Sequence, residues 1–305
     1  MGREARADCI ALLTEVLRAR QMDSGGWAYR GSAQESIEAT CLAALALMPE
    51  TETRGAAIAF LFGSQLGDGG WPAFRGDSEG SWTTALAVCT LNATGDFAAA
   101  REKAARWLNA ERGREGNWLW RWKFKTVDRS VRFNPDKYGW SWSRDSASWV
   151  IPTAFSVIAL KQFTACSRNA ESEKRIRLGV EMLLDRACVD GGWNAGNSVV
   201  YGVPLRPHIE ATAIALLALQ DEERSSVIRA GIEWLKGRAT SIRSSESLAW
   251  CILSLFVYQE PIQELKEALA ARLSAKGGVE NTATLATALL ALKCGEMIHP
   301  FEVLR

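Results

Sequence analysis

The chain has 305 residues, of which 48% are apolar, and its 36 Lys and Arg residues are balanced by 35 Asp and Glu residues. Nucleic-acid-binding proteins usually carry a basic excess, so this balance argues against that class and we expect no nucleic-acid partner. The seven cysteines form no Cys-x-x-Cys pair, which favours a reducing compartment. We expect neither a signal peptide nor a membrane span, because no apolar run approaches the required ~18 residues. These features predict a cytoplasmic protein, with contact to one membrane face left open.

Amphipathic and apolar segments alternate along the chain. The amphipathic segments carry charge on one side only, which predicts outer helices with one solvated face. They lie near 4–20, 53–65, 98–110, 172–187, 223–236 and 261–274. The apolar runs between them align on an anchor column made of Thr40, Thr84, Thr153, Thr212, Leu248 and Leu285. Leu stands seven residues after every anchor and small residues stand one and three residues after it, so these runs are predicted to be buried inner helices.

A Gly-Gly-Trp turn precedes several of the inner runs. It occurs at 25–27, 69–71 and 191–193, with a looser Gly-Asn-Trp copy at 116–118. This recurrence indicates one supersecondary unit that is repeated. Six helical hairpins predict an all-α fold, a closed (α/α)6 barrel or toroid. An open solenoid is the alternative, but it needs polar capping repeats and the last inner run is as apolar as the middle ones.

Two intervals between successive anchors are longer than the others. We expect one α/α-toroid domain over 1–305, with a Trp-rich insertion at about 111–149 and a second long loop at about 188–207. Strand signals are nearly absent, and the segment 197–201 is too short to change the fold class. Insertions in repeat proteins tend to fall on the binding face, so we place the working end of the molecule there.

A Gly-Gly-Trp turn joined to an Ala/Leu-rich inner run recurs along the chain. The pattern is carried by the segments Gln65–Trp71, Gly80–Ala87 and Ile209–Ala215, and Gln21 and Trp27 fit it as well. This pattern resembles the repeat of the prenyltransferase and squalene cyclase superfamily, and the resemblance covers nearly the whole chain. It implies a single-domain, bacterial-type, terpenoid cyclase-like barrel. It further implies a central apolar cavity that holds an isoprenoid-type chain.

The segment His-Ile-Glu-Ala-Thr at 208–212 opens an inner run. Class II cyclases of this superfamily protonate an alkene or epoxide there with an Asp-x-Asp-Asp-Thr motif, so the resemblance implies catalytic roles for Glu210 and His208. Ala211 replaces the third Asp of the motif, and full-size cyclases carry a second such domain. A non-catalytic lipid- or protein-binding toroid is therefore an open alternative.

A prenyltransferase-like subunit is a lesser alternative. The β subunit of the protein prenyltransferases binds Zn²⁺ through Asp, Cys and His, and the sequence offers no such converging set. We therefore expect no metal and no cofactor.

Acidic residues recur two positions before the anchor, at Glu38, Glu210 and Glu246. One explanation is the helix dipole, which favours acids in the first turn of any helix. The other is chemical, because a carboxylic acid buried beside apolar walls has a raised pKa and can serve as a general acid.

Six of the thirteen tryptophans lie in the insertion. Trp118, Trp120 and Trp122 alternate with other residues, so in an extended segment their rings would share one side. Aromatic faces stabilise cations, and such rings also simply pack against one another at the end of a barrel. The substrate-binding candidates are Trp118, Trp120, Trp122, Trp140, Trp142, Trp149, Glu38 and Asp145.

Two further features of the insertion have ordinary explanations beside functional ones. Asp145 precedes the third inner run, where a helix cap or an ion pair with Arg144 is the alternative to a second acid. The insertion is also basic, for which a solvated face is the simplest explanation and phosphate docking the other. The basic residues are Arg121, Lys123, Lys125, Arg129 and Arg132.

Overall fold

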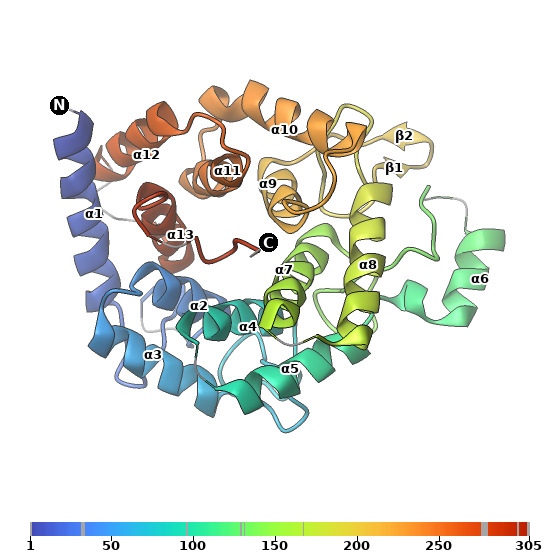
Figure 1. Ribbon diagram of the computed structural model, residues 1–305, viewed down its shortest axis with the longest axis horizontal. Helices are drawn as coiled ribbons and strands as arrows, with labels where there is room; N and C mark the ends of the chain where they lie inside the picture. Colours follow the sequence, from blue (N-terminus) through green and yellow to red (C-terminus); the bar gives the residue numbers. More distant parts are fainter. Residues whose placement is uncertain are drawn as a thin grey trace.

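Figure 1 shows the computed structural model of the protein, which forms a ring of helices in two concentric layers. The structure describes residues 2–31, 34–95, 97–128, 130, 132–166, 168–275, 280–297 and 299–303. The outer helices are α1 (Gly2–Ala19), α3 (Thr51–Gly63), α5 (Ala98–Ala110), α8 (Ala170–Asp185), α10 (Ser226–Arg238) and α12 (Gln263–Ala275). The inner helices are α2 (Ile37–Ala46), α4 (Thr83–Thr94), α7 (Val150–Cys166), α9 (Ile209–Ala218), α11 (Ser245–Val257) and α13 (Thr282–Leu292). The all-α toroid of six helical hairpins is confirmed.

The ring is closed by contacts between the first and last hairpins. Helix α1 packs against α12 and α13, and α13 packs against α2 (Figure 1). The backbone N–H of Thr282 donates to the carbonyl oxygen of Tyr29 at 2.9 Å, which ties the turn before α2 to the start of α13. The prediction of a closed barrel over an open solenoid is therefore correct.

The anchor column and the Trp turns form one structural device. In the first four repeats the backbone N–H of a buried Trp donates to an anchor Thr hydroxyl, and its indole N–H donates to a Leu carbonyl of the preceding outer helix. The Trp–Thr pairs are Trp27–Thr40, Trp71–Thr84, Trp140–Thr153 and Trp193–Thr212, at 2.8–3.0 Å. The indoles donate to Leu17, Leu61, Leu108 and Leu183 at 2.6–2.8 Å. Each Trp thus staples a turn to both helix layers.

The glycines of the turn allow a close approach to the next outer helix. Gly25 has φ +89°, and a Cβ there would lie 2.3 Å from the carbonyl oxygen of Ala56. Gly69 repeats this geometry with φ +103° and 2.6 Å to the carbonyl oxygen of Lys103. Only glycine combines a left-handed backbone with room for this contact.

The fourth Trp turn is not where the sequence analysis placed it. Trp118, in the Gly-Asn-Trp copy, is 72% exposed. Trp140 instead makes the two hydrogen bonds that are typical of these turns, from its backbone N–H to Thr153 and from its indole N–H to the Leu108 carbonyl oxygen. The prediction failed because the insertion lies between the outer helix α5 and its turn. The true turn therefore comes later in the chain than the repeat spacing suggests.

The two long intervals carry the elements that lie outside the two layers. The insertion forms the 3-10 turn η1 (Arg114–Gly116) and helix α6 (Trp118–Thr126), which lies beyond the outer layer in Figure 1. The second loop forms the two-residue antiparallel strands β1 (Val199–Val200) and β2 (Val203–Pro204). A further 3-10 turn, η2 (Ala239–Ser241), follows α10. Among the described residues, no helix has the length and apolar character needed to cross a membrane.

A buried ion pair joins the Trp-rich insertion to the end of α8, just before the second long loop. Arg186 and Glu115 are each 1% exposed in their side chains, with 3.3 Å between their charged atoms. Glu115 also accepts from the backbone N–H and hydroxyl of Ser148, and the Arg186 guanidinium lies over the Phe133 ring at 4.0 Å. Breaking such a pair by removing one partner costs about 3–5 kcal/mol, so it fixes the Trp-rich insertion against the ring.

Candidate functional site

The first turns of the inner helices bring carboxylates together at one end of the ring. Glu38 lies on α2, Glu210 on α9 and Glu246 on α11, each in its first turn. Their charges act on one another, because Glu246 and Glu210 both raise the pKa of Glu38. We call these three residues the acidic rim. The sequence column that predicted them corresponds to one end of the barrel, since the inner helices all run the same way.

Glu38 has the most perturbed carboxyl group of the rim. Burial raises its pKa to about 7, and the charges of Glu246 and Glu210 add to this effect. The Tyr29 hydroxyl donates a hydrogen bond to Glu38, which opposes the rise only in part. The Glu38 side chain is half-buried, although protein atoms surround its carboxyl group closely. A large fraction of Glu38 is therefore protonated at neutral pH.

The other two rim carboxylates are held by hydroxyl groups of neighbouring inner helices. Ser247 of α11 donates to Glu210 at 2.7 Å, and Thr284 of α13 donates to Glu246 at 3.1 Å. Burial, followed by the charge of Glu210, raises the pKa of Glu246. Among the described residues, none of the three rim carboxylates forms an ion pair. Uncompensated acids at the end of a barrel cost stability, which marks them as candidates for function.

The described His208 and Glu210 side chains have different surroundings. His208 is the N-cap residue of α9, its side chain is exposed, and its backbone N–H donates to the carbonyl oxygen of Trp193 at 2.8 Å. No hydrogen bond or ion pair between these two described residues is formed, and Glu210 is bound by Ser247 instead.

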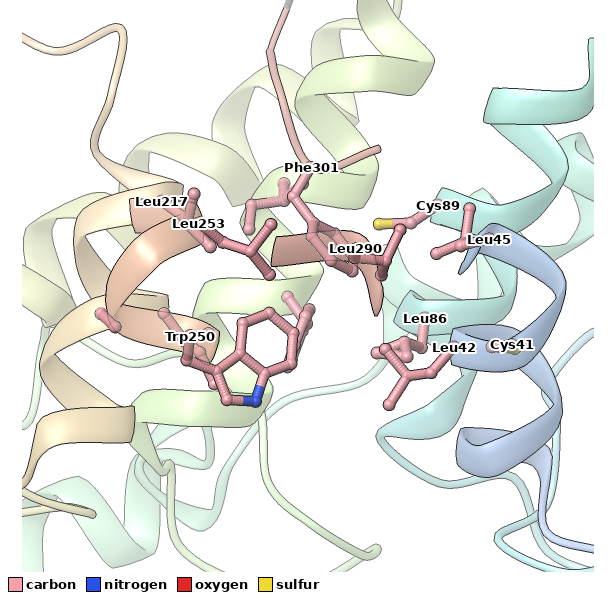
Figure 2. Packing of buried hydrophobic residues seen from close by; sticks show 14 of the residues in the cluster. Cys41, Leu42, Leu45, Leu86, Cys89, Leu217, Trp250, Leu253, Leu290 and Phe301 are labelled. Atoms are coloured by element: carbon pink, nitrogen blue, oxygen red, sulfur yellow. The ribbon is translucent and has the colours of Figure 1, made fainter. Parts of the chain in front are cut away.

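Below the acidic rim the centre of the ring is apolar. Figure 2 shows side chains from α2, α4, α9, α11 and α13 facing one another across the ring. They are buried, and they include Cys41, Leu42, Leu45, Leu86, Cys89, Leu217, Trp250, Leu253 and Leu290. Phe301, from the end of the chain, reaches into the same space (Figure 2).

A chain of aromatic rings runs through this interior. Trp142 contacts Trp82 edge to face at 5.0 Å between centroids, and Trp82 contacts Phe155 at 5.8 Å. Phe155 in turn contacts Trp250 and Phe301, both at 5.7 Å. Trp142 is thus connected to the interior, whereas Trp82, Phe155 and Phe301 were not among the sequence candidates. The rings offer π faces that stabilise cations within an apolar space.

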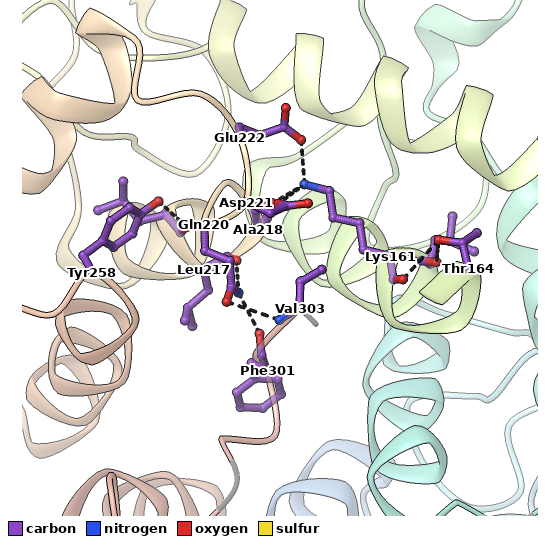
Figure 3. Close-up of polar contacts among 12 residues, drawn as sticks. Lys161, Thr164, Leu217, Ala218, Gln220, Asp221, Glu222, Tyr258, Phe301 and Val303 are labelled. Carbon is purple, nitrogen blue, oxygen red and sulfur yellow. Dashed lines mark hydrogen bonds and ion pairs between the residues drawn. The ribbon is translucent and has the colours of Figure 1, made fainter. Parts of the chain in front are cut away.

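The C-terminal segment 299–303, which we call the plug segment, enters the ring from the end opposite the acidic rim. Gln220, just after α9, donates to the carbonyl oxygen of Phe301 at 2.9 Å and accepts from the backbone N–H of Val303 at 3.2 Å (Figure 3). Gln162 on α7 donates to the carbonyl oxygen of Pro300 at 2.8 Å. These bonds fix Phe301 at 0% exposure in the ring centre. No repeat pattern covers this segment, so sequence reasoning had no signal by which to find it.

The other predicted aromatic residues lie in three different environments. Trp140 is buried, its backbone N–H donates to the Thr153 hydroxyl, and the Arg175 guanidinium lies 4.0 Å from the centre of its ring. Trp149 is half-buried beside Gly196, and its backbone N–H donates to the carbonyl oxygen of Trp140 at 2.9 Å. Trp118, Trp120 and Trp122 lie on α6, outside the ring. The extended conformation predicted for those three is wrong, because the segment is helical and alternate residues point in different directions.

Asp145 lies in an exposed turn rather than at a helix start. Its backbone is left-handed, with φ 57°, and α7 begins five positions later at Val150. Arg144 pairs with Glu111 at 2.9 Å and with Asp68 at 3.1 Å. The predicted helix cap and the predicted pair with Arg144 are therefore both wrong. Among the described residues, no group of three or more His, Cys, Asp or Glu side chains is arranged to hold a metal ion.

Solved structures with the same architecture include enzymes of different chemistry. A protein from Actinoplanes matches with a TM-score of 0.64 at 14% identity, over 96% of this chain and 100% of that one. A variant of type II terpene cyclase MstE from Scytonema, in complex with its product merosterolic acid A, matches at 0.63 and 17%, over 95% and 97%. Cellobiose 2-epimerase from Spirochaeta thermophila matches at 0.60 and 12%, over 95% and 96%. At these identities the likeness shows the fold alone. No protein-family model and no curated protein matches the sequence.

Proposed function

We propose that the protein is a terpenoid cyclase-like acid catalyst that binds an apolar, polyprenyl-type chain inside the ring. The observation that carries the proposal is the Glu38 carboxyl group, whose pKa is raised to about 7 at the rim of an apolar, aromatic interior. Glu38 takes the role of proton donor that the resemblance gave to Glu210. Glu210 and Glu246 contribute by keeping Glu38 protonated. His208, the exposed N-cap residue of α9, has no role in the proton transfer.

The chemistry is a proton-initiated isomerisation. The π electrons of a substrate alkene take the proton of the Glu38 carboxyl group, which leaves a carboxylate and a tertiary carbocation. A second alkene closes a ring on that cation, and loss of a proton returns the acid to its starting form with no net oxidation. Phe155 contacts both Trp82 and Trp250, and the faces of these rings would stabilise the cation.

The composition of the interior favours an isoprenoid over a sugar. Glycosidases with two catalytic carboxyl groups also need polar side chains that bind the sugar hydroxyls. The side chains that face one another in Figure 2 are aliphatic, aromatic or cysteine. The fold does not separate the two classes, because it occurs in terpene cyclase MstE and in cellobiose 2-epimerase alike.

The proposal is tested with a panel of polyprenyl substrates and a matched panel of oligosaccharides, with products identified by mass spectrometry. We expect cyclised isomers from a polyprenyl substrate only. Loss of a general acid typically costs about 10²–10⁴-fold in rate, so Glu38→Gln should lower turnover by at least about a hundredfold. Glu264→Gln, an exposed acid on α12, is the matched control and should leave turnover unchanged. Full activity of Glu38→Gln would remove Glu38 from the mechanism.

A second candidate function, a non-catalytic lipid- or protein-binding toroid, rests on the plug segment. Phe301 occupies the centre of the ring with Phe155 and Trp250, as expected for a barrel filled by its own side chains. Under this alternative none of the substrates is turned over, while a radiolabelled polyprenyl chain is still retained. A prenyltransferase-like subunit stays a lesser proposal, tested by adding a prenyl diphosphate and an acceptor peptide to the same assay.

A further inference from the structure

Helix α6 carries an apolar face that no described residue covers. Trp118 is 72% exposed and Trp122 is 55% exposed, and Leu119 and Val127 beside them are exposed as well. Residues four apart share one face of a helix, so Trp118 and Trp122 point together into solvent. Trp120 contacts Phe124 of the same helix instead, and the Arg114 guanidinium lies over its ring at 5.0 Å. Two exposed indoles on one helical face are unusual for a surface that meets only water.

A second exposed apolar group lies next to α6, on the hairpin of β1 and β2. Tyr201 at its tip is 81% exposed and Val203 is 60% exposed. The backbone N–H of Arg132 donates to the carbonyl oxygen of Val199 at 3.2 Å, which connects the hairpin to the insertion. Figure 1 shows α6 and the hairpin at the same edge of the ring. We call the exposed apolar residues of the two long intervals the outer face, and they are Trp118, Leu119, Trp122, Val127, Val189, Tyr201, Val203 and Leu205.

This concentration is specific to the insertions. Of the large apolar side chains that are exposed among the described residues, all but Phe62 belong to the outer face. The twelve helices of the ring therefore cover their apolar residues, with that single exception. The two long intervals do not, although Glu115, which precedes α6, is itself buried in an ion pair with Arg186.

Positive charge accompanies the indoles. The segment 118–126 contains Arg121, Lys123 and Lys125 and no acidic residue, although the chain as a whole is nearly neutral. The Lys123 ammonium lies 4.6 Å from the Trp120 ring, and Lys125 pairs with Asp136 at the surface at 2.6 Å. An exposed pair of this kind is weak, so it leaves most of the charge available.

We propose that the outer face docks on the surface of an anionic lipid bilayer. Tryptophan rings settle at the level of the lipid headgroups, where their apolar body and polar N–H are both satisfied. Basic side chains next to them are attracted to anionic headgroups, and apolar area and charge together set the strength of binding. A purely apolar protein partner would not require the run of positive charge. This inference does not depend on the proposed function, because no residue of the acidic rim takes part.

The test is flotation of the full-length protein with vesicles of phosphatidylcholine alone or phosphatidylcholine mixed with phosphatidylglycerol. The protein floats with the mixed vesicles at low salt, and the neutral vesicles and high salt both reduce the bound fraction. Trp118→Ser with Trp122→Ser lowers the partition coefficient by at least about tenfold. Arg121→Gln with Lys123→Gln lowers it by about fivefold for each charge removed.

Matched controls separate the outer face from general surface changes. Phe62→Ser removes the one exposed ring that lies elsewhere, on α3, and Lys103→Gln with Arg106→Gln removes two charges from α5. Both controls bind vesicles as the wild type does.

Three results would overturn the proposal. The first is equal flotation of the wild type and the double tryptophan variant. The second is binding to neutral vesicles that matches binding to anionic ones. The third is the absence of vesicle binding together with a dimer that the double tryptophan variant dissociates, which would assign the outer face to a second copy of the chain.

Discussion

The acidic rim and the plug segment lie at opposite ends of the same ring, and the two ends differ in whether their charged side chains form ion pairs. At the rim, the carboxyl groups of Glu38, Glu210 and Glu246 are bound by hydroxyl groups and by no cation among the described residues. At the plug end, Lys161 is buried but donates to the carbonyl oxygen of Ala218 and forms two ion pairs. One end therefore satisfies its charges fully, and the other leaves acids uncompensated.

The helix dipole accounts for the sign of charge at each end but not for this difference. The first turns of inner helices attract acids and their last turns attract bases. Lys266 follows the same rule, donating to the carbonyl oxygen of Cys294 at 2.7 Å. The dipole alone would favour an ionised Glu38, yet its pKa is raised to about 7. Burial and mutual repulsion outweigh the dipole at the rim, as expected of a site arranged for proton transfer.

The largest expected effect is at the plug end. Phe301→Ala removes a ring with 0% exposure that contacts Phe155 and Trp250, so it should lower the free energy of unfolding by about 3–5 kcal/mol. Urea titration measures the loss. Phe62→Ala on the outer surface is the control and should cost less than about 1 kcal/mol. A similarly small loss for Phe301→Ala would mean that the plug segment does not fill the ring in solution.

The next effect is an acid-side loss of stability from His299. Burial lowers its pKa from 6.5 to about 4, so its contribution is fully present above about pH 6.5 and is lost as the pH falls through about 4. The expected size is about 3 kcal/mol. His299→Asn removes the titration while offering an acceptor to the Phe301 N–H, and its stability should depend less on pH in this window. Parallel curves for the two proteins would contradict a buried neutral His299.

The rim should show the reverse dependence. The folded-state pKa of Glu38 is raised from 4.5 to about 7, so its stabilising contribution is fully present below about pH 4.5 and is lost as the pH rises through about 7. We expect a loss on the order of 2 kcal/mol, reduced by the partial exposure of the group. Glu38→Gln should flatten the curve, and Glu264→Gln should not. The opposite signs at the two ends are the sharpest test of the comparison.

The features of the fold and of the rim that the repeat determines could be predicted from the sequence. The Leu column and the small residues beside each anchor are local patterns, so they specified the inner helices and the closed ring. Glu38, Glu210 and Glu246 shared a column, and parallel inner helices convert a shared column into a shared end of the barrel. Their convergence was therefore foreseeable, although the dominance of Glu38 was not. That depends on how deeply the Glu38 carboxyl group is buried, which the repeat pattern does not determine.

The failures concern segments that the repeat does not govern. Alternating tryptophans suggested an extended strand, but Asn117 caps a helix by accepting from the backbone N–H of Leu119 at 2.9 Å. The helix-forming Arg and Lys residues between the rings then continue it. Phe301 was missed because its position in the ring depends on bonds to Gln162 and Gln220, which are distant in sequence. Tertiary contacts of this kind leave no periodic signal.

The smallest predicted effect separates the causes that act on Glu38. Tyr29→Phe removes the hydrogen bond that lowers the pKa of Glu38, so that pKa should rise. Glu246→Gln and Glu210→Gln each remove a neighbouring negative charge, so the same pKa should fall, more for Glu246 than for Glu210. Each change should amount to at most about one pH unit. The infrared band of the protonated carboxyl group, absent in Glu38→Gln, follows the titration without any substrate. An unchanged pKa in both Tyr29→Phe and Glu246→Gln would mean that burial alone controls Glu38, and the rim would then be a structural cluster with no mutual tuning of its acids.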